Sequence, residues 1–346
     1  MRFIGNKTQL LENIKEVVDK HAAGANSFCD IFSGTASVAR FFKQWYEVYS
    51  NDLLYFSYCL QRATIENPSK PTFERLTKAL GILDPISYFN EMSTECMESL
   101  PIERRFFQNN YAPTGGRMYI TDSNALRIDF ARNTIEDWNN AGFLSTDEYF
   151  YLVACVVEGA PFVSNIAGTY GAFNKKWDVR SNKLFVLIDL PVVNNGLSNR
   201  SYNEDGAKLL QHISGDILYI DPPYNERQYL PNYHVLETAA KYDFPTLHGV
   251  TGQRPYKLQR SDFCSKKTVV NAFDALLENA RFKHIILSYN TDGIMTLDEI
   301  EATMKKHGVA STFEVNYIPY RRFKSKNIVT KTEELKEMLV YIQKEV

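Results

Sequence analysis

The segment Tyr219-Ile220-Asp221-Pro222-Pro223-Tyr224 says the most about the fold and the chemistry of this chain. It continues an apolar run that begins after Gly215 and is typical of a short buried strand, so Asp221 falls where that strand ends. Open α/β sheets bind ligands at the carboxyl ends of their strands. The Asp221 carboxylate and the Pro222 carbonyl can accept the two hydrogens of a planar amino group, while Tyr224 offers a stacking face. The segment favours methyl transfer onto a nucleobase amino group; the simpler alternative is that the prolines only close a turn.

A second pattern lies near the N-terminus, where residues 27–42 read as a strand, a glycine turn at Phe32-Ser33-Gly34-Thr35 and an amphipathic helix. Gly34 allows close backbone approach to a ligand, and the helix directs its N-terminus into the same pocket. Residues 46–52 read as a second strand that ends in Asp52, a placement that lets a carboxylate bind ribose hydroxyls. The pattern predicts a nucleotide-type pocket, although a lone strand, turn and helix is often only scaffold.

A third pattern is the segment Arg2-Phe3-Ile4-Gly5-Asn6-Lys7, which precedes an expected helix at 8–20. Lys7 can meet a carboxylate there. The alternative is an ordinary helix start.

Taken together and in this order, these motifs resemble the Dam-like, alpha-type (D12) class of DNA adenine methyltransferases. Residues 165–174 look like the DNA-contacting hairpin of that family, and residues 287–290 look like the strand after its catalytic turn. Residues 225–254 are similar to adenine methylases of restriction-modification systems, including some whose targets contain ATG. The resemblance implies a Rossmann-like S-adenosylmethionine-dependent methyltransferase sheet with an inserted target-recognition domain.

The resemblance also assigns roles to individual residues. It implies S-adenosylmethionine as the methyl donor and the amino group at N6 of a flipped-out adenine in duplex DNA as the acceptor. Its catalytic residues would be Asp221, Pro222, Pro223 and Tyr224, and its cofactor-binding residues Phe3, Lys7, Asp30, Phe32, Ser33, Gly34, Thr35, Asp52 and Asp221. One departure is that the family often has two or three consecutive glycines where this chain has Ser33-Gly34-Thr35.

We expect DNA contacts from the proposed hairpin and from two basic clusters, because clusters of Lys and Arg bind phosphates. The candidates are Tyr170, Lys175, Lys176, Arg227, Arg321, Arg322, Phe323 and Lys324. We further expect a monomer that protects host DNA within a restriction-modification system, with a cognate endonuclease acting separately.

The composition argues against several classes of protein and site. The chain has 346 residues and a net charge of −2, which by itself does not indicate a nucleic-acid partner. Its five cysteines and six histidines show no metal-ligand spacing, so we expect neither a metal site nor a disulfide framework. We also expect a cytoplasmic protein, since there is no leader-like or membrane-spanning apolar run.

The positions of the motifs predict the domain organisation. The catalytic domain would comprise residues 1–67 and 204–346, with the helix at 147–160 part of it, and residues 68–203 would be largely a target-recognition insertion. Further helices are expected at 73–80, 123–139, 262–279 and 297–307, and strands at 285–289, 314–320 and 338–342.

Two other classes of function stay open. An RNA or protein-glutamine methyltransferase would use a similar turn, but the long insertion and the basic clusters favour duplex DNA. An inactive DNA-binding specificity module would keep the fold without the chemistry, and the intact Asp221 to Tyr224 segment argues against it.

Overall fold

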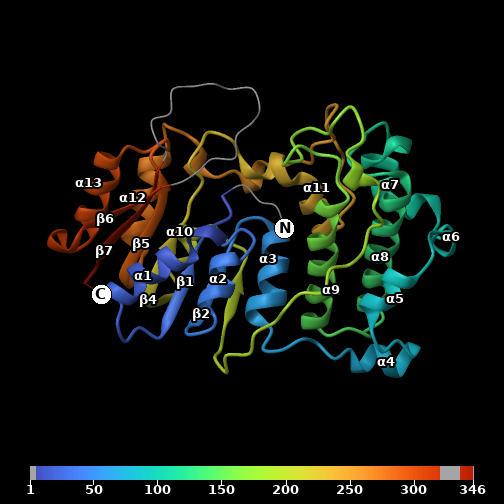
Figure 1. The fold of residues 1–346 in the computed structure, drawn as a ribbon, viewed down its shortest axis with the longest axis horizontal. Helices are drawn as coiled ribbons and strands as arrows, with labels where there is room; N and C mark the ends of the chain where they lie inside the picture. The colour runs from blue at the N-terminus through green and yellow to red at the C-terminus, as the bar shows by residue number, and fades with distance from the viewer. Residues whose placement is uncertain (1–4, 320–335, 346) are drawn as a thin grey trace.

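Seven strands form a single sheet in the computed structural model, which describes residues 5–319 and 336–345 (Figure 1). The strands are β1 (Ser27–Asp30), β2 (Glu47–Asn51), β3 (Arg200–Tyr202), β4 (Ser214–Ile220), β5 (Arg281–Asn290), β6 (Glu314–Pro319) and β7 (Lys336–Gln343). Their order is β3-β2-β1-β4-β5-β7-β6. Strand β7 runs antiparallel to both of its neighbours, β5 and β6, and the other neighbouring strands pair in parallel. The predicted Rossmann-like sheet is confirmed.

The order of the strands reverses direction at the centre of the sheet. From β1 the chain moves outward to β2 and β3 on one side, whereas β4 leads to β5 on the other. The β1 and β4 strands pair in parallel, with Asp30 opposite Tyr219 at their carboxyl ends. A crevice for a ligand is expected at such a switch point.

Alternate residues of the central strands face two separate cores, because successive side chains of a strand point to opposite faces. Ile217 and Tyr219 of β4 pack on one side with helices α1 and α2, and Leu218 and Ile220 pack on the other side with α12 and α13. The helices near the sheet are α1 (Leu11–His21), α2 (Ser37–Phe42), α10 (Gly206–Leu209), α12 (Val269–Asn279) and α13 (Leu297–His307).

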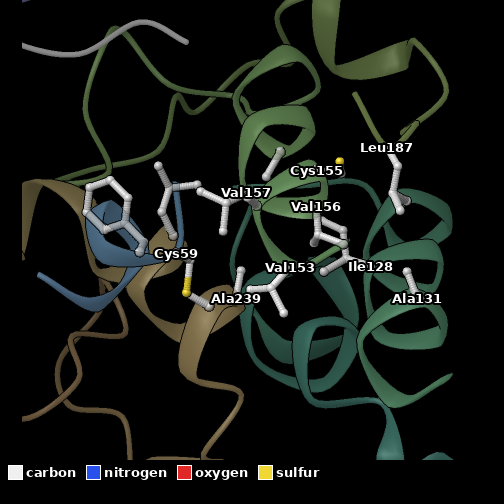
Figure 2. Packing of buried hydrophobic residues seen from close by; sticks show 14 of the residues in the cluster. Cys59, Ile128, Ala131, Val153, Cys155, Val156, Val157, Leu187 and Ala239 are labelled. Carbon is white, nitrogen blue, oxygen red and sulfur yellow. The ribbon is translucent and has the colours of Figure 1, made fainter. Parts of the chain in front are cut away.

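A third core lies beside the sheet and consists of helices (Figure 1). Its helices are α3 (Tyr55–Gln61), α4 (Glu74–Leu80), α5 (Pro85–Glu91), α7 (Phe106–Tyr111), α8 (Asp122–Asn140), α9 (Thr146–Gly159) and α11 (Tyr229–Lys241); the short α6 (Thr94–Met97) packs against α8. Figure 2 shows Val153 and Val157 of α9 between Ile128 of α8 and Cys59 of α3, with Ala239 of α11 close by. The α9 helix is therefore central to this helical core.

Most of the predicted elements are present, with three corrections. The helix expected at 262–279 begins only at Val269, because Ser265 adopts an extended backbone after a 3-10 turn at Asp262–Cys264. Residues 165–174 contain no strand and form a loop, whose ends are held by hydrogen bonds between Asn165 and Asn174. The β3 strand falls inside the range predicted as an insertion, so the sheet already resumes at Arg200. No helix among the described residues is long and apolar enough to cross a bilayer.

Glu237 of α11 caps helix α3 and so joins two elements of the helical core. Its fully buried carboxylate accepts hydrogen bonds from the backbone N–H groups of Tyr55 (3.1 Å) and Phe56 (3.0 Å) and from the Gln259 amide (2.6 Å). Lys241 lies 3.2 Å away. Four donors thus converge on one buried anion.

We expect Glu237→Gln to lower the free energy of unfolding by about 2 kcal/mol, because a charged acceptor is lost and a buried donor is left unpaired. Urea denaturation would measure the change. Glu301→Gln is the matched control, since Glu301 forms only a half-exposed pair with Lys305 and its loss should change stability by less than about 1 kcal/mol. Equal effects of the two substitutions would contradict the capping role.

Candidate active site

A cavity of about 230 Å³ lies beyond the carboxyl ends of β1, β2 and β4. It brings together most of the residues that the sequence singled out. Its lining includes Lys7, Asp30, Phe32, Ser33, Gly34, Thr35, Asp52, Asp221 and Pro223. Pro222 is buried beside Asp221, and Tyr224 is partly buried. Phe3 lies outside the described residues.

The turn after β1 is fixed by its own hydrogen bonds. The Ser33 hydroxyl donates to the Asp30 carbonyl (2.7 Å), so it stabilises the turn where the family often has glycine. Gly34 has a φ of +51°, a region that favours glycine, and its N–H donates to the Asp52 carboxylate (2.8 Å). Although the family often has consecutive glycines here, Ser33 and Gly34 still hold the turn against the end of β2.

Asp52 connects the two nucleotide-type motifs. Its second oxygen accepts from the Leu54 N–H at 2.8 Å. Burial raises the pKa of Asp52 to about 6, while the N–H bonds from Leu54 and Gly34 act in the opposite direction. The carboxylate is thus held rigidly at the cavity wall, where it can accept hydroxyl groups of a ligand.

Asp30 is almost fully buried, and its Oδ1 atom has no hydrogen-bond partner among the described residues. Burial, together with the nearby Asp221 carboxylate, raises the pKa of Asp30 well above its usual range. A buried acceptor without a donor is costly unless a bound group supplies one. The cavity therefore fits a ligand that carries a donor or a positive charge.

The catalytic candidate Asp221 belongs to a buried ionic cluster. Lys7 lies 3.2 Å from the Asp221 carboxylate and also pairs with Glu337 of β7, which accepts a hydrogen bond from Ser288 (2.9 Å). Burial alone would lower the pKa of Lys7, but the carboxylates of Asp221 and Glu337 outweigh it and raise that pKa. Burial raises the pKa of Asp221 to about 7, with Lys7 opposing and Glu337 adding to this increase.

Two tyrosines adjoin this cluster. A Cβ atom added to Gly5 would lie 3.6 Å from the Tyr229 hydroxyl and 3.7 Å from the Tyr224 ring, so the N-terminal segment packs directly against both. The Lys7 ammonium lies 5.9 Å from the centre of the Tyr224 ring. Tyr229 opens helix α11 and lines the cavity. The site thus offers two aromatic rings beside Asp221.

Sequence reasoning missed Tyr229 and Glu337. It also missed the pair formed by Gln228 and Ser261, which exchange hydrogen bonds of 2.9 Å and 2.8 Å at the cavity wall. A partial signal existed for Tyr229, because it follows the catalytic turn by only a few residues. None existed for Glu337, whose role depends on contacts distant in sequence.

The DNA-binding candidates have different environments. Tyr170 was predicted to contact DNA, but its side chain is 1% exposed and its hydroxyl bonds to Ser164 (2.8 Å), so the structure places it in the core. Lys175, Lys176 and Arg227 are exposed to solvent. The candidates Arg321, Arg322, Phe323 and Lys324 lie outside the described residues.

Known proteins resemble this chain over its whole length. The type II methyltransferase M.FokI of Planomicrobium okeanokoites is 47% identical over 350 residues, which cover 100% of this chain and 53% of that protein. The modification methylase StsI of Streptococcus sanguinis is 43% identical, covering 99% and 52%. The chain therefore spans about half the length of these two relatives. The type II methyltransferase M.NlaIII of Neisseria lactamica is 37% identical, covering 94% of this chain and 93% of that protein.

A family model described as D12 class N6 adenine-specific DNA methyltransferase matches residues 3–303. This range contains the sheet strands β1 to β5, the cavity, Asp221 and the helical core. The family implies a methyl donor as cofactor. On the strength of this match and of the relatives, the chain belongs to the D12 class of N6 adenine-specific DNA methyltransferases.

Proposed function

We propose that this chain transfers a methyl group from S-adenosylmethionine to the N6 amino group of an adenine in a short duplex DNA sequence. The observation that carries the proposal is the position of Asp221, at the end of β4 and on the wall of a cavity that Asp30 and Asp52 also line. Restriction-modification methylases among the relatives support a role in protecting host DNA, with a cognate endonuclease acting separately.

The cavity fits S-adenosylmethionine by the chemistry of its residues. When bound, this donor supplies an electrophilic methyl group on a positively charged sulfur. Asp52 would accept the ribose hydroxyls, since its carboxylate is fixed at the end of β2. The unpartnered Oδ1 of Asp30 suits the donor's ammonium group. Residues Phe32 to Thr35 would line the pocket around it.

Asp221 orients the acceptor and stabilises the charge that develops on it. Its carboxylate and the Pro222 carbonyl accept the two amino hydrogens, which directs the nitrogen lone pair toward the methyl group. As the nitrogen–carbon bond forms and the sulfur–carbon bond breaks, positive charge grows on the nitrogen, and Asp221 lies beside it. The nitrogen then releases one proton, so no covalent enzyme intermediate is required.

The adenine must leave the helix to reach Asp221, at a cost of a few kcal/mol. Tyr224 is the ring predicted to stack on the base, and Tyr229, which lines the cavity, adds a second aromatic group, since both tyrosines lie against Gly5. Stacking on an aromatic ring is worth roughly 1–3 kcal/mol per base. These rings would therefore recover part of the cost of flipping.

We assign target recognition largely to residues 68–203, apart from strand β3 and from helix α9, which packs with α3 and α11 of the catalytic segments. Lys175, Lys176 and Arg227 are exposed and would bind phosphates. We further propose that the protein acts as a monomer.

The direct test is incubation of the purified protein with radiolabelled S-adenosylmethionine and unmethylated bacterial DNA, followed by digestion to nucleosides. We expect the label in N6-methyl-2′-deoxyadenosine. Label in a methylated deoxycytidine would overturn the acceptor. Label only in RNA or protein, offered in parallel reactions, would overturn DNA as the substrate.

We expect Asp221→Ala to reduce kcat at least about 100-fold, because it removes the main group that stabilises charge on the acceptor nitrogen. Binding of S-adenosylmethionine, measured by calorimetry, should stay within about threefold of the unmodified protein. Asp292→Ala, at an exposed carboxylate just after β5, is the control and should leave kcat unchanged. Near-normal turnover by the Asp221 variant would refute its assignment.

Asp221 must be ionised to accept the amino hydrogens, and its pKa is about 7. We therefore expect kcat to fall as the pH decreases below about 7, as Asp221 becomes protonated. Glu337 raises this pKa, so Glu337→Gln should move the acid limb of the pH profile to lower pH. The less basic carboxylate should also lower the plateau of kcat.

Glu314→Gln is the control for this shift, since Glu314 lies on the neighbouring strand β6 and pairs with Lys20 at 2.6 Å. It should leave the pH profile unchanged. A lower plateau in the Glu337 variant with an unmoved acid limb would mean that Glu337 supports the fold without tuning Asp221.

A further inference from the structure

Residues 248–253 form a tight turn that is well ordered by its own hydrogen bonds. The backbone of His248 and Gln253 exchanges two of them, at 2.8 Å and 2.9 Å. Gly249 and Gly252 both have positive φ, at +71° and +64°. Val250 stands at the tip and is 82% exposed. The turn therefore presents an apolar side chain that contributes little to any core.

The Arg117 side chain fixes this turn by hydrogen bonds to its backbone carbonyls. Its guanidinium donates to the carbonyls of Val250 (3.0 Å) and Gly249 (3.1 Å), and also to that of Asn110 (2.8 Å). A Cβ atom at Gly252 would lie 2.6 Å from the Arg117 Nε atom, and the φ of Gly252 is positive, so the position favours glycine. The bonds from Arg117 thus fix the turn in a conformation that exposes Val250.

Tyr119 joins the turn to the loop 165–174. Its hydroxyl lies 2.8 Å from the Tyr170 carbonyl and 3.0 Å from the Thr251 carbonyl. His234 donates to the same Tyr170 carbonyl from Nε2, at 2.9 Å. Burial lowers the pKa of His234 to about 4, so the ring stays neutral and keeps this role near neutral pH. The loop and the turn are therefore parts of one unit.

Both parts are anchored at the start of helix α11, next to the cavity. The Tyr170 N–H donates to the Asn232 carbonyl (2.7 Å), and the Gln253 amide donates to the Pro231 carbonyl (3.2 Å). Tyr229, which lies two residues before Pro231, lines the cavity. Figure 1 shows loops above α9 and beside α11. The unit thus lies beside the mouth of the active site.

The exposed side chains of this unit are basic or apolar. Lys175 and Lys176 follow the loop, and Lys257 and Arg260 follow the turn. Leu258, between the last two, is 94% exposed. Basic residues suit phosphates, and exposed apolar side chains suit base edges such as the thymine methyl group.

We propose that the turn 248–253 and residues 257–260 form, together with the loop 165–174, a two-part surface that contacts duplex DNA around the target base. This deepens the proposed function and rests on it. The basic residues bind phosphates on both parts, while Val250 and Leu258 contact the bases or sugars between them. The shared Tyr119 hydroxyl keeps the two parts in a fixed relation to each other.

The first test compares Val250→Glu with Ala23→Glu in binding of a fluorescent duplex of mixed sequence, measured by anisotropy. Ala23 is exposed and lies between α1 and β1, before the amino end of β1 and outside the residues assigned to DNA contact. We expect Val250→Glu to weaken binding by about tenfold or more and Ala23→Glu to have no effect. Thermal melts and S-adenosylmethionine binding should match the unmodified protein for both.

The second test uses the salt dependence of binding. Replacing Lys257 by Gln should reduce the slope of log K against log salt by about 0.9, the value for one phosphate contact. Lys283→Gln, at an exposed position near the start of β5 and outside the residues assigned to DNA contact, should leave the slope unchanged. If both Val250→Glu and Lys257→Gln behaved like their controls while the unmodified protein methylated DNA, the two-part surface would be wrong and the proposed function would stand. Absence of methylation by the unmodified protein would instead count against the function.

Discussion

The proposed catalytic turn depends on one buried ammonium group that two carboxylates share. Lys7 comes from the N-terminal segment, Asp221 from the end of β4 and Glu337 from the antiparallel strand β7. Breaking a buried ion pair by removing one partner typically costs about 3–5 kcal/mol, because a charge is left uncompensated. The geometry of the turn is therefore maintained by segments near both ends of the described chain. The same contacts place Gly5 against Tyr224 and Tyr229, so the acceptor side of the site is completed by the N-terminal segment.

The local part of this site was predictable from sequence, and the long-range part was not. Asp52 and Asp221 could be found because each follows a segment that reads as a strand, and parallel strands bring their carboxyl ends to one edge of a sheet. Lys7 could be found from its place before a helix. Glu337 could not be found, because in the sequence it resembles a surface glutamate. Its role depends on the position of β7 between β5 and β6. The antiparallel pairing alone turns its side chain toward Ser288 and Lys7.

The wrong predictions share a physical cause, which is competition between side chains and regular backbone structure. The hairpin expected at 165–174 is replaced by a loop in which the Asn165 side chain bonds the carbonyls of Met118 and Asn174. Such side-chain bonds offer the backbone an alternative to a strand ladder. Tyr170 was predicted to contact DNA, yet its backbone bonds to Tyr119 and to α11, and its ring is buried. The exposed neighbours of Tyr170, such as Lys175 and Lys176, are therefore better placed for surface contacts than the Tyr170 ring.

Charge is divided within the molecule in a way that suits the proposed reaction. The cavity holds the acids Asp30, Asp52 and Asp221 with Lys7 as a positive group among them, whereas exposed basic residues gather on the loops outside it. A phosphate is repelled by the cavity and attracted to the loops, but a flipped base is neutral and can enter. In the proposed reaction, the acids would also favour a donor with a positively charged sulfur. Transfer of the methyl group would remove that charge, so the same carboxylates would bind the product less strongly than the donor. The electrostatics proposed to hold the donor in place would thus also favour exchange of the product after each turnover.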